Sequence, residues 1–216
     1  MKKQSKIGLA WCKAHRNLPI EFWQNILFPD ETIIEIHPFN AMNRIRRFSF
    51  ENPFQKKYIC PKVKFPNKIM FWGAISARIK SNLVPIDGLM NSSKYITEII
   101  EKEVQPIVNS DHTIVFQQDN AGCHTAHKVY EYFEKNDIKY LKWPSHSPDL
   151  NIIENIWQII KRRLNKITIR NKQSLITSAK MVWNEMINDN LILKLANSMP
   201  SRIQAVIDNK GHPTKY

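Results

Sequence analysis

The sequence predicts an α/β fold: five short strands accompanied by helices, followed by a C-terminal helical extension. Two observations indicate this class. Runs rich in Ile, Val, Phe and Trp occur as five short segments, and three of them precede the first long helical pattern. After the third strand, helical and strand patterns alternate, and beyond about residue 172 only helical periodicity remains. With 216 residues, 43% of them hydrophobic, the chain can bury one well-filled core.

The first third of the chain predicts a helical lead-in and three strands. Residues 1–25 carry apolar side chains at helical spacing and are expected to form one or two short helices. A long strand is expected over 26–37, where Pro29 predicts a bulge because proline cannot donate to a ladder. Strands 68–76 and 82–87 flank a polar turn, which predicts a hairpin.

The middle of the chain predicts alternating helices and strands. A helix is expected from about residue 93 and should end near Pro106. A strand over 113–118 and a helix over 125–135 follow, and a strand over 138–143 completes the set.

A further helix is expected to begin near Asp149, whose side chain would serve as the N-cap. Its apolar stripe leaves Glu154 on the polar side near the helix start, in line with Lys161 and Arg162. From 172 to 208 the apolar spacing predicts two or three terminal helices. Trp72, Trp143 and Trp157 are predicted to be packing residues.

Charge and cysteine content narrow the classes of partner and compartment. Lys and Arg number 32 against 19 Asp and Glu, a formal charge of +13 that favours a polyanion such as nucleic acid. The isolated Cys12, Cys60 and Cys123 predict buried, unpaired thiols in a reducing compartment. No apolar run approaches the roughly 20 residues that span a bilayer, and no apolar segment follows the first lysines, so neither membrane insertion nor secretion is expected.

Three acids stand out as candidate catalytic residues. Asp30 lies on the first predicted strand, Asp119 at the end of the fourth, and Glu154 near a helix start, with 34 residues between the last two. Carboxylate oxygens suit Mg²⁺ or Mn²⁺, and without metal such a cluster would repel and raise its own pKa values. Three acids in a very basic chain therefore predict a metal site that acts on phosphates.

Five motifs in order closely resemble the Tc/mariner superfamily of DDE transposases. The 34-residue gap and the final glutamate place the resemblance with the Tc-like branch, and it covers nearly the whole chain. The motifs are Leu27-Phe-Pro-Asp-Glu31, Phe71-Trp-Gly73, Gln117-Gln-Asp-Asn-Ala121 with His124-Thr-Ala126, Trp143-Pro-Ser-His-Ser-Pro-Asp-Leu-Asn151, and Ile153-Glu-Asn155 with Trp157.

This resemblance implies a ribonuclease-H-like fold, with a mixed five-stranded sheet flanked by helices that brings the three acids together. A DDE catalytic domain would occupy 26–170, including a basic insertion over about 38–67. Residues 1–25 would lead into it, and the helices of 171–216 would pack on the same domain.

The resemblance also implies an activity, cofactors and partners. The domain would cut at transposon ends and join the freed 3′ ends to TA-containing target DNA, as a homodimer in the nucleus. Two Mg²⁺ or Mn²⁺ ions would bind, with Asp30 bridging both and Asp119 and Glu154 each holding one.

Other candidate residues keep more than one interpretation. DNA contacts are predicted at Arg44, Arg46 and Arg47 in the insertion, and at Lys161 and Arg162 beyond Glu154.

His124 would support the Asp119 loop or contact DNA, and Cys123, His124 and His127 lack the second ligand pair of a zinc site. Glu31 points away from Asp30 by strand alternation and is expected to be no ligand.

Two departures from the family bear on function. Gly122 and Ile152 stand where the family usually has proline, which predicts altered loop rigidity without loss of a ligand. Family members also carry a helix-turn-helix region before the catalytic domain, and this chain begins after it. An alternative function is therefore an inactive or domesticated transposase-derived DNA-binding protein that lacks this region.

Overall fold

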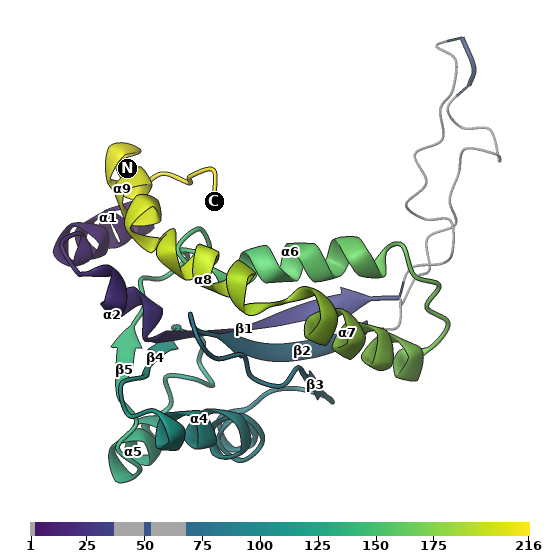
Figure 1. The fold of residues 1–216 in the computed structure, drawn as a ribbon, viewed down its shortest axis with the longest axis horizontal. Helices are drawn as coiled ribbons and strands as arrows, with labels where there is room; N and C mark the ends of the chain where they lie inside the picture. Colours follow the sequence, from purple (N-terminus) through teal and green to yellow (C-terminus); the bar gives the residue numbers. More distant parts are fainter. Residues whose placement is uncertain (1–2, 37–49, 53–67) are drawn as a thin grey trace.

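A mixed five-stranded sheet forms the centre of the molecule (Figure 1). The computed structural model describes residues 3–36, 50–52 and 68–216. The strand order is β3-β2-β1-β4-β5, in which β1 pairs antiparallel with β2 and parallel with β4. The predicted mixed sheet is confirmed, and so is the predicted hairpin, since β2 and β3 pair antiparallel. The strands are β1 (Ile26–Glu35), β2 (Lys68–Ile75), β3 (Val84–Ile86), β4 (Val115–Gln118) and β5 (Tyr140–Lys142).

Helices cover both faces of the sheet (Figure 1). Alternate residues of β1 enter two separate apolar clusters: Ile26 and Phe28 face one, and Leu27 faces the other. The first cluster is closed by α1 (Lys3–His15), α2 (Ile20–Gln24), α6 (Ile153–Leu164), α7 (Lys172–Met186), α8 (Asp189–Asn197) and α9 (Met199–Asp208). The second is closed by the π-helical segment η2 (Tyr95–Val104), α4 (Gln105–Ser110) and α5 (His127–Lys135). The short helix α3 (Ser92–Lys94), which has no buried residue, leads into η2.

The predicted bulge at Pro29 is wrong. The β1–β2 register runs without interruption through Phe28↔Ile75, Pro29↔Ala74 and Asp30↔Gly73. On the other edge of β1, pairing with β4 ends at Leu27, so the missing N–H of Pro29 removes no ladder bond. The Pro29 carbonyl on that edge instead accepts a hydrogen bond from Asn151 Nδ2 at 3.2 Å.

The predicted helix end near Pro106 is also wrong. The helix that starts at Ser92 passes through η2 and continues as α4 to Ser110. Pro106 lies where the π-helical hydrogen bonds of η2 give way to the α-helical bonds of α4.

Asp149 does not cap α6, contrary to expectation. The helix begins at Ile153, four residues later, and no side chain caps it. The Asp149 carboxylate accepts hydrogen bonds from Thr214, from the backbone N at 3.3 Å and from Oγ1 at 3.0 Å. The Asp149 side chain therefore binds Thr214, near the C-terminus, instead of capping α6.

Two of the three cysteines lie in the described residues, and both are free thiols as predicted. Cys12 is buried and Cys123 is half-buried, both as free thiols, whereas Cys60 lies outside the described residues. Among the helices that the structure describes, none is both long and apolar enough to cross a membrane.

Candidate active site

Asp30 lies on β1 and faces the helices that carry the tryptophans. Its Oδ2 accepts a hydrogen bond from Trp157 Nε1 at 3.1 Å. Gly73 lies opposite Asp30 in the β1–β2 register, and a Cβ there would lie 2.9 Å from the Trp183 ring and 3.1 Å from the Trp157 ring. The missing side chain therefore lets the two stacked indoles approach the sheet, and Trp157 reaches Asp30.

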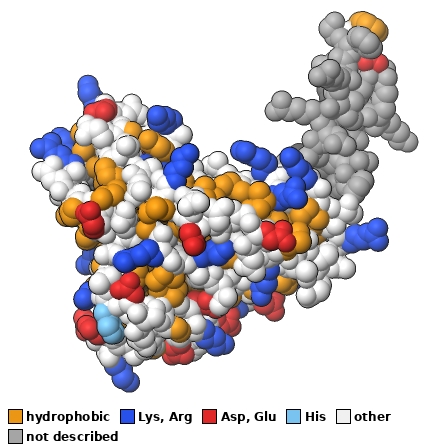
Figure 2. Space-filling view, viewed as in Figure 1, with side chains coloured by type: hydrophobic (Ala, Val, Ile, Leu, Met, Phe, Trp, Pro, Cys, Tyr) orange, Lys and Arg blue, Asp and Glu red, His pale blue; other side chains and the backbone are white. Residues whose placement is uncertain are grey.

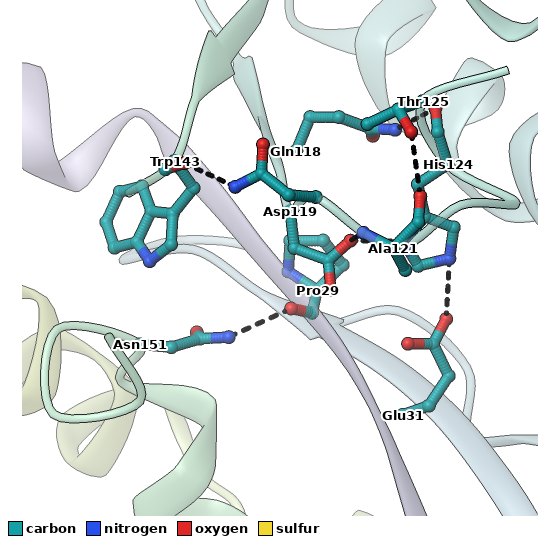
Figure 3. Close-up of polar contacts among 10 residues, drawn as sticks. Pro29, Glu31, Gln118, Asp119, Ala121, His124, Thr125, Trp143 and Asn151 are labelled. Carbon is teal, nitrogen blue, oxygen red and sulfur yellow. Dashed lines mark hydrogen bonds and ion pairs between the residues drawn. The ribbon is translucent and has the colours of Figure 1, made fainter. Parts of the chain in front are cut away.

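Asp119 follows the last residue of β4 and is fixed by the loop that comes after it. Its Oδ1 accepts the backbone N–H of Ala121 at 3.0 Å and also contacts His124 Nδ1 (Figure 3). Gln118 Nε2 donates to the His124 carbonyl at 2.6 Å. Asn120 Nδ2 donates to the Trp143 carbonyl at 2.8 Å, which ties this loop to the end of β5.

Glu154 lies in the first turn of α6 and is half-buried. The turn before it is held on the sheet by Asn151, whose side chain donates to the carbonyl of Pro29, next to Asp30 (Figure 3). The Glu154 N–H in turn donates to the Asn151 carbonyl at 3.2 Å. One amide side chain thus connects the start of the Glu154 helix to the Asp30 strand.

The three predicted acids, Asp30, Asp119 and Glu154, line one cavity of ≈ 410 Å³. Burial raises the pKa of Asp30 to about 7, and the negative charges of Glu154 and Glu31 add to this rise. Within 3–36, 50–52 and 68–216, however, no group of three or more His, Cys, Asp or Glu side chains stands arranged to hold a metal ion. The fold brings the acids to one cavity without closing them into a ligand cluster.

His124 forms a buried cationic bridge between two carboxylates. Its Nδ1 contacts Asp119, and its Nε2 lies 3.3 Å from Glu31 Oε1, an ion pair without hydrogen-bond alignment. Burial opposes protonation, but the close contacts with the carboxylates of Asp119 and Glu31 outweigh it and raise the pKa of His124 to about 10. The same bridge lowers the pKa of Asp119 despite its burial. His124 is therefore charged at neutral pH.

Glu31 and Trp157 make contacts at the candidate site that sequence reasoning missed. Glu31 faces away from Asp30, as strand alternation predicted, but it reaches the site through His124. Trp157 packs in the core as predicted and also donates to Asp30. The motif Leu27-Phe-Pro-Asp-Glu31 was the one sequence feature that drew attention to Glu31. Nothing in the sequence indicated that Glu31 pairs with His124.

The inner wall of the cavity offers further polar atoms. Both amide atoms of Gln117, the Trp143 Nε1 and the Asn151 Oδ1 are buried, and in the described part of the chain none has a hydrogen-bond partner. Buried polar atoms are normally paired, so water or a polar substrate group has donors and acceptors to meet there.

The predicted DNA-contact residues differ in their location: some lie outside the described residues, some are exposed, and one is buried. Arg44, Arg46 and Arg47 lie outside the described residues. Lys161 and Arg162 are exposed in the last turn of α6, and Figure 2 shows Lys and Arg side chains gathered where that helix ends. Of the two roles predicted for His124, its burial and two carboxylate contacts favour support of the Asp119 loop, since neither ring nitrogen is left for DNA.

The amino-acid sequence of this chain matches a known protein superfamily. The profile described as "DDE superfamily endonuclease" matches residues 26–176, so the chain belongs to the DDE superfamily. The Tc1 transposase of Caenorhabditis elegans is 34% identical over the whole chain, which spans 79% of that protein. The predicted Tc-like relationship is thereby confirmed.

Solved structures show the same fold. The Mos1 transposase in a paired-end complex with the left transposon end matches all of this chain with a TM-score of 0.81 at 17% identity, and the chain spans 64% of it. The Mos1 catalytic domain solved with raltegravir and Mg matches with a TM-score of 0.76 at 15% identity, and the chain spans 98% of it. The expected ribonuclease-H-like fold is confirmed, and the chain is a DDE transposase catalytic domain.

Proposed function

We propose that this domain carries out metal-dependent DNA strand cleavage and strand transfer, with Asp30, Asp119 and Glu154 as its catalytic carboxylates. The observation that carries the proposal is the shared cavity, to which β1, β4 and α6 each bring one acid. The net charge of +13 supports a polyanionic substrate. Intact acids in a chain related along its whole length to the Tc1 transposase favour catalysis over the role of a DNA-binding remnant.

The donor set of the cavity fits divalent Mg²⁺ or Mn²⁺. All three predicted ligands are carboxylates, and the raised pKa of Asp30 reflects burial and repulsion that a cation would relieve. Asp30, Asp119 and Glu154 would hold two such ions, whose chemistry would be activation of the attacking oxygen and stabilisation of the leaving 3′ oxygen. Mos1 catalytic-domain structures were solved with Mg and with Mn.

The chain's own side chains orient the carboxylates. Trp157 holds one oxygen of Asp30, and His124 holds one oxygen of Asp119. Asn151 sets the start of α6 against β1 and so brings Glu154 to the cavity. These contacts would leave rotation of the half-buried Glu154 side chain as the simplest adjustment that completes a ligand set.

The DNA would run from the cavity along α6. Lys161 and Arg162 lie on the Glu154 side of this helix and are placed to contact phosphates, and Arg44, Arg46 and Arg47 are proposed to assist. We also propose transposon ends and TA-containing DNA as substrates, a homodimer as the working assembly and the nucleus as its location.

The test is strand transfer of a labelled oligonucleotide with a free 3′ end into supercoiled plasmid, in Mg²⁺ or Mn²⁺. Wild type should give metal-dependent products, and Asp119→Asn should lower the rate about 10³-fold or more. Glu185→Gln, an exposed acid on α7, should act as wild type. Tight DNA binding without products in either metal would instead favour the DNA-binding remnant.

A further inference from the structure

Arg202 is a buried cation that binds both ends of the segment carrying Glu154. It lies on α9 and is 2% exposed. Its Nη1 donates to the Asp149 carbonyl at 2.8 Å, and its Nη2 donates to Asn155 Oδ1 at 2.6 Å. Its Nε donates to Ser198 Oγ at 2.8 Å, which fixes the guanidinium against its own helix.

The two outer contacts of Arg202 enclose the junction between loop and helix. Asp149 precedes this junction and Asn155 follows Glu154 directly, so one rigid fork sets the spacing across residues 149–155. The same segment contains Asn151, which binds the Asp30 strand. The position of Glu154 relative to Asp30 is therefore fixed from the sheet side by Asn151 and from the opposite side by Arg202.

The C-terminal residues cover this fork. The Tyr216 ring lies 4.6 Å from the guanidinium carbon, a cation–π contact. Thr214 binds the Asp149 carboxylate through both its N–H and its hydroxyl group. Gly211 has a φ of +79°, and a Cβ there would lie 2.2 Å from the Ser5 carbonyl oxygen, so α1 holds the start of this covering segment closely.

The burial of Arg202 is costly in free energy. Burial lowers its pKa, and the charges of Tyr216 and Asp149 only partly oppose this effect. A guanidinium remains charged, and among the described residues no carboxylate oxygen is seen within 4.0 Å of it. An apolar side chain could fill the same space without this desolvation cost. A packing role alone does not account for an arginine whose three nitrogens all meet neutral acceptors.

We propose that Arg202 is a positioning residue that holds Glu154 in catalytic register with Asp30. This inference rests on the proposed function of the acids, and it adds a residue of the C-terminal helices to the machinery of the site. Lysine keeps the charge but cannot bind Asp149 and Asn155 through one planar fork, so Arg202→Lys separates geometry from charge.

Hydrogen exchange tests the structural half of the proposal without any catalysis. The N–H groups of Leu150, Asn151 and Glu154 lie in this segment and donate to the carbonyls of Ser147, Pro148 and Asn151, respectively. In Arg202→Lys they should exchange roughly tenfold faster or more, while the amides of β1 and β2 keep their wild-type rates. Ile203→Val, the neighbouring buried position on α9, should leave the segment unchanged. Unchanged exchange at these three amides in Arg202→Lys would overturn the inference.

Kinetics test the functional half. Arg202→Lys should lower kcat for strand transfer about 10- to 100-fold and raise the half-saturating Mg²⁺ concentration, with unchanged DNA affinity. Asn155→Ala removes one contact of the fork and should give a smaller loss that is not additive with Arg202→Lys. Ile203→Val should keep the wild-type kcat.

The two tests fail in distinguishable ways. Wild type without activity in Mg²⁺ or Mn²⁺ would contradict the proposed function, while the exchange rates would still decide whether Arg202 holds the segment. Faster exchange with a wild-type kcat would show a merely structural residue and overturn the positioning role. Loss of kcat in a folded Asn155→Ala variant would support it even if Arg202→Lys fails to fold.

Discussion

At the scale of single residues, Gly73 controls how closely two tryptophans approach Asp30. A Cβ at this position would meet the Trp183 ring at 2.9 Å, inside a fully packed core. We predict that Gly73→Ala lowers the free energy of unfolding by about 1–3 kcal/mol, because overpacking forces the rings to shift, and that it weakens the Trp157–Asp30 bond. Urea unfolding followed by tryptophan fluorescence measures the change in the free energy of unfolding.

Gly122 supplies the matched control for Gly73. A Cβ at Gly122 meets nothing within 4 Å, and its φ is not in the positive range. Gly122→Ala should therefore leave stability unchanged or slightly raised, since alanine restricts the unfolded chain. Equal stability of the Gly73→Ala variant and wild type would show that the indoles have room to move.

Glu31 acts on the site through His124, and its substitution should affect activity more than folding. Glu31→Gln keeps the size of the side chain but removes one of the two charges that hold the imidazolium. We expect kcat for strand transfer to fall about 10- to 100-fold, because Asp119 loses part of the support of its partner. Glu35→Gln, an exposed acid on the same strand, serves as the control.

Two results for Glu31→Gln would contradict the bridging role. One is a wild-type kcat. The other is a loss of activity that is fully explained by a lower fraction of folded protein, as measured by circular dichroism under assay conditions.

At the scale of elements, sequence periodicity predicted which segments form strands and helices because those patterns are local. The alternation in β1 and the 3.6-residue stripe of α6 both reflect which face packs on the core. The predictions were wrong where residues distant in the sequence determine the local structure. Pro29 needs no bulge because the pairing of β1 with β4 already ends at Leu27, and Asp149 does not cap α6 because its carboxylate binds Thr214.

The same distinction between local and distant interactions explains which residues of the candidate site could be predicted from the sequence. Asp30, Asp119 and Glu154 were predictable because each stands in a short motif, and the structure places all three on one cavity. The residues that hold them, Glu31 and Trp157, could not be assigned because their partners come from other elements. Strand alternation gives the direction in which Glu31 points, but only the loop after β4 brings His124 to that side.

At the scale of the whole molecule, the cavity lined by the three acids lies where the antiparallel and parallel parts of the sheet meet the helical layer. The strand β1 contributes to both parts, and α6 packs across it on the face that Asp30 shares. Helices α7 to α9 join the same apolar cluster, and through Arg202 they reach the segment that carries Glu154. Stability of the C-terminal helices and geometry of the cavity are therefore coupled.

Because the three acids come from separate elements, metal binding should stabilise the entire fold. An ion held jointly by Asp30, Asp119 and Glu154 binds the folded state alone, so Mg²⁺ at 100 times its Kd should add about 2.7 kcal/mol. For a chain of this size, that corresponds to a rise in Tm of roughly 5–10 °C. Thermal unfolding with MgCl₂, against NaCl of equal ionic strength, measures it. Glu154→Gln should lose most of the rise and Glu185→Gln none, whereas an equal rise in all three proteins would place the stabilising ion outside this cavity.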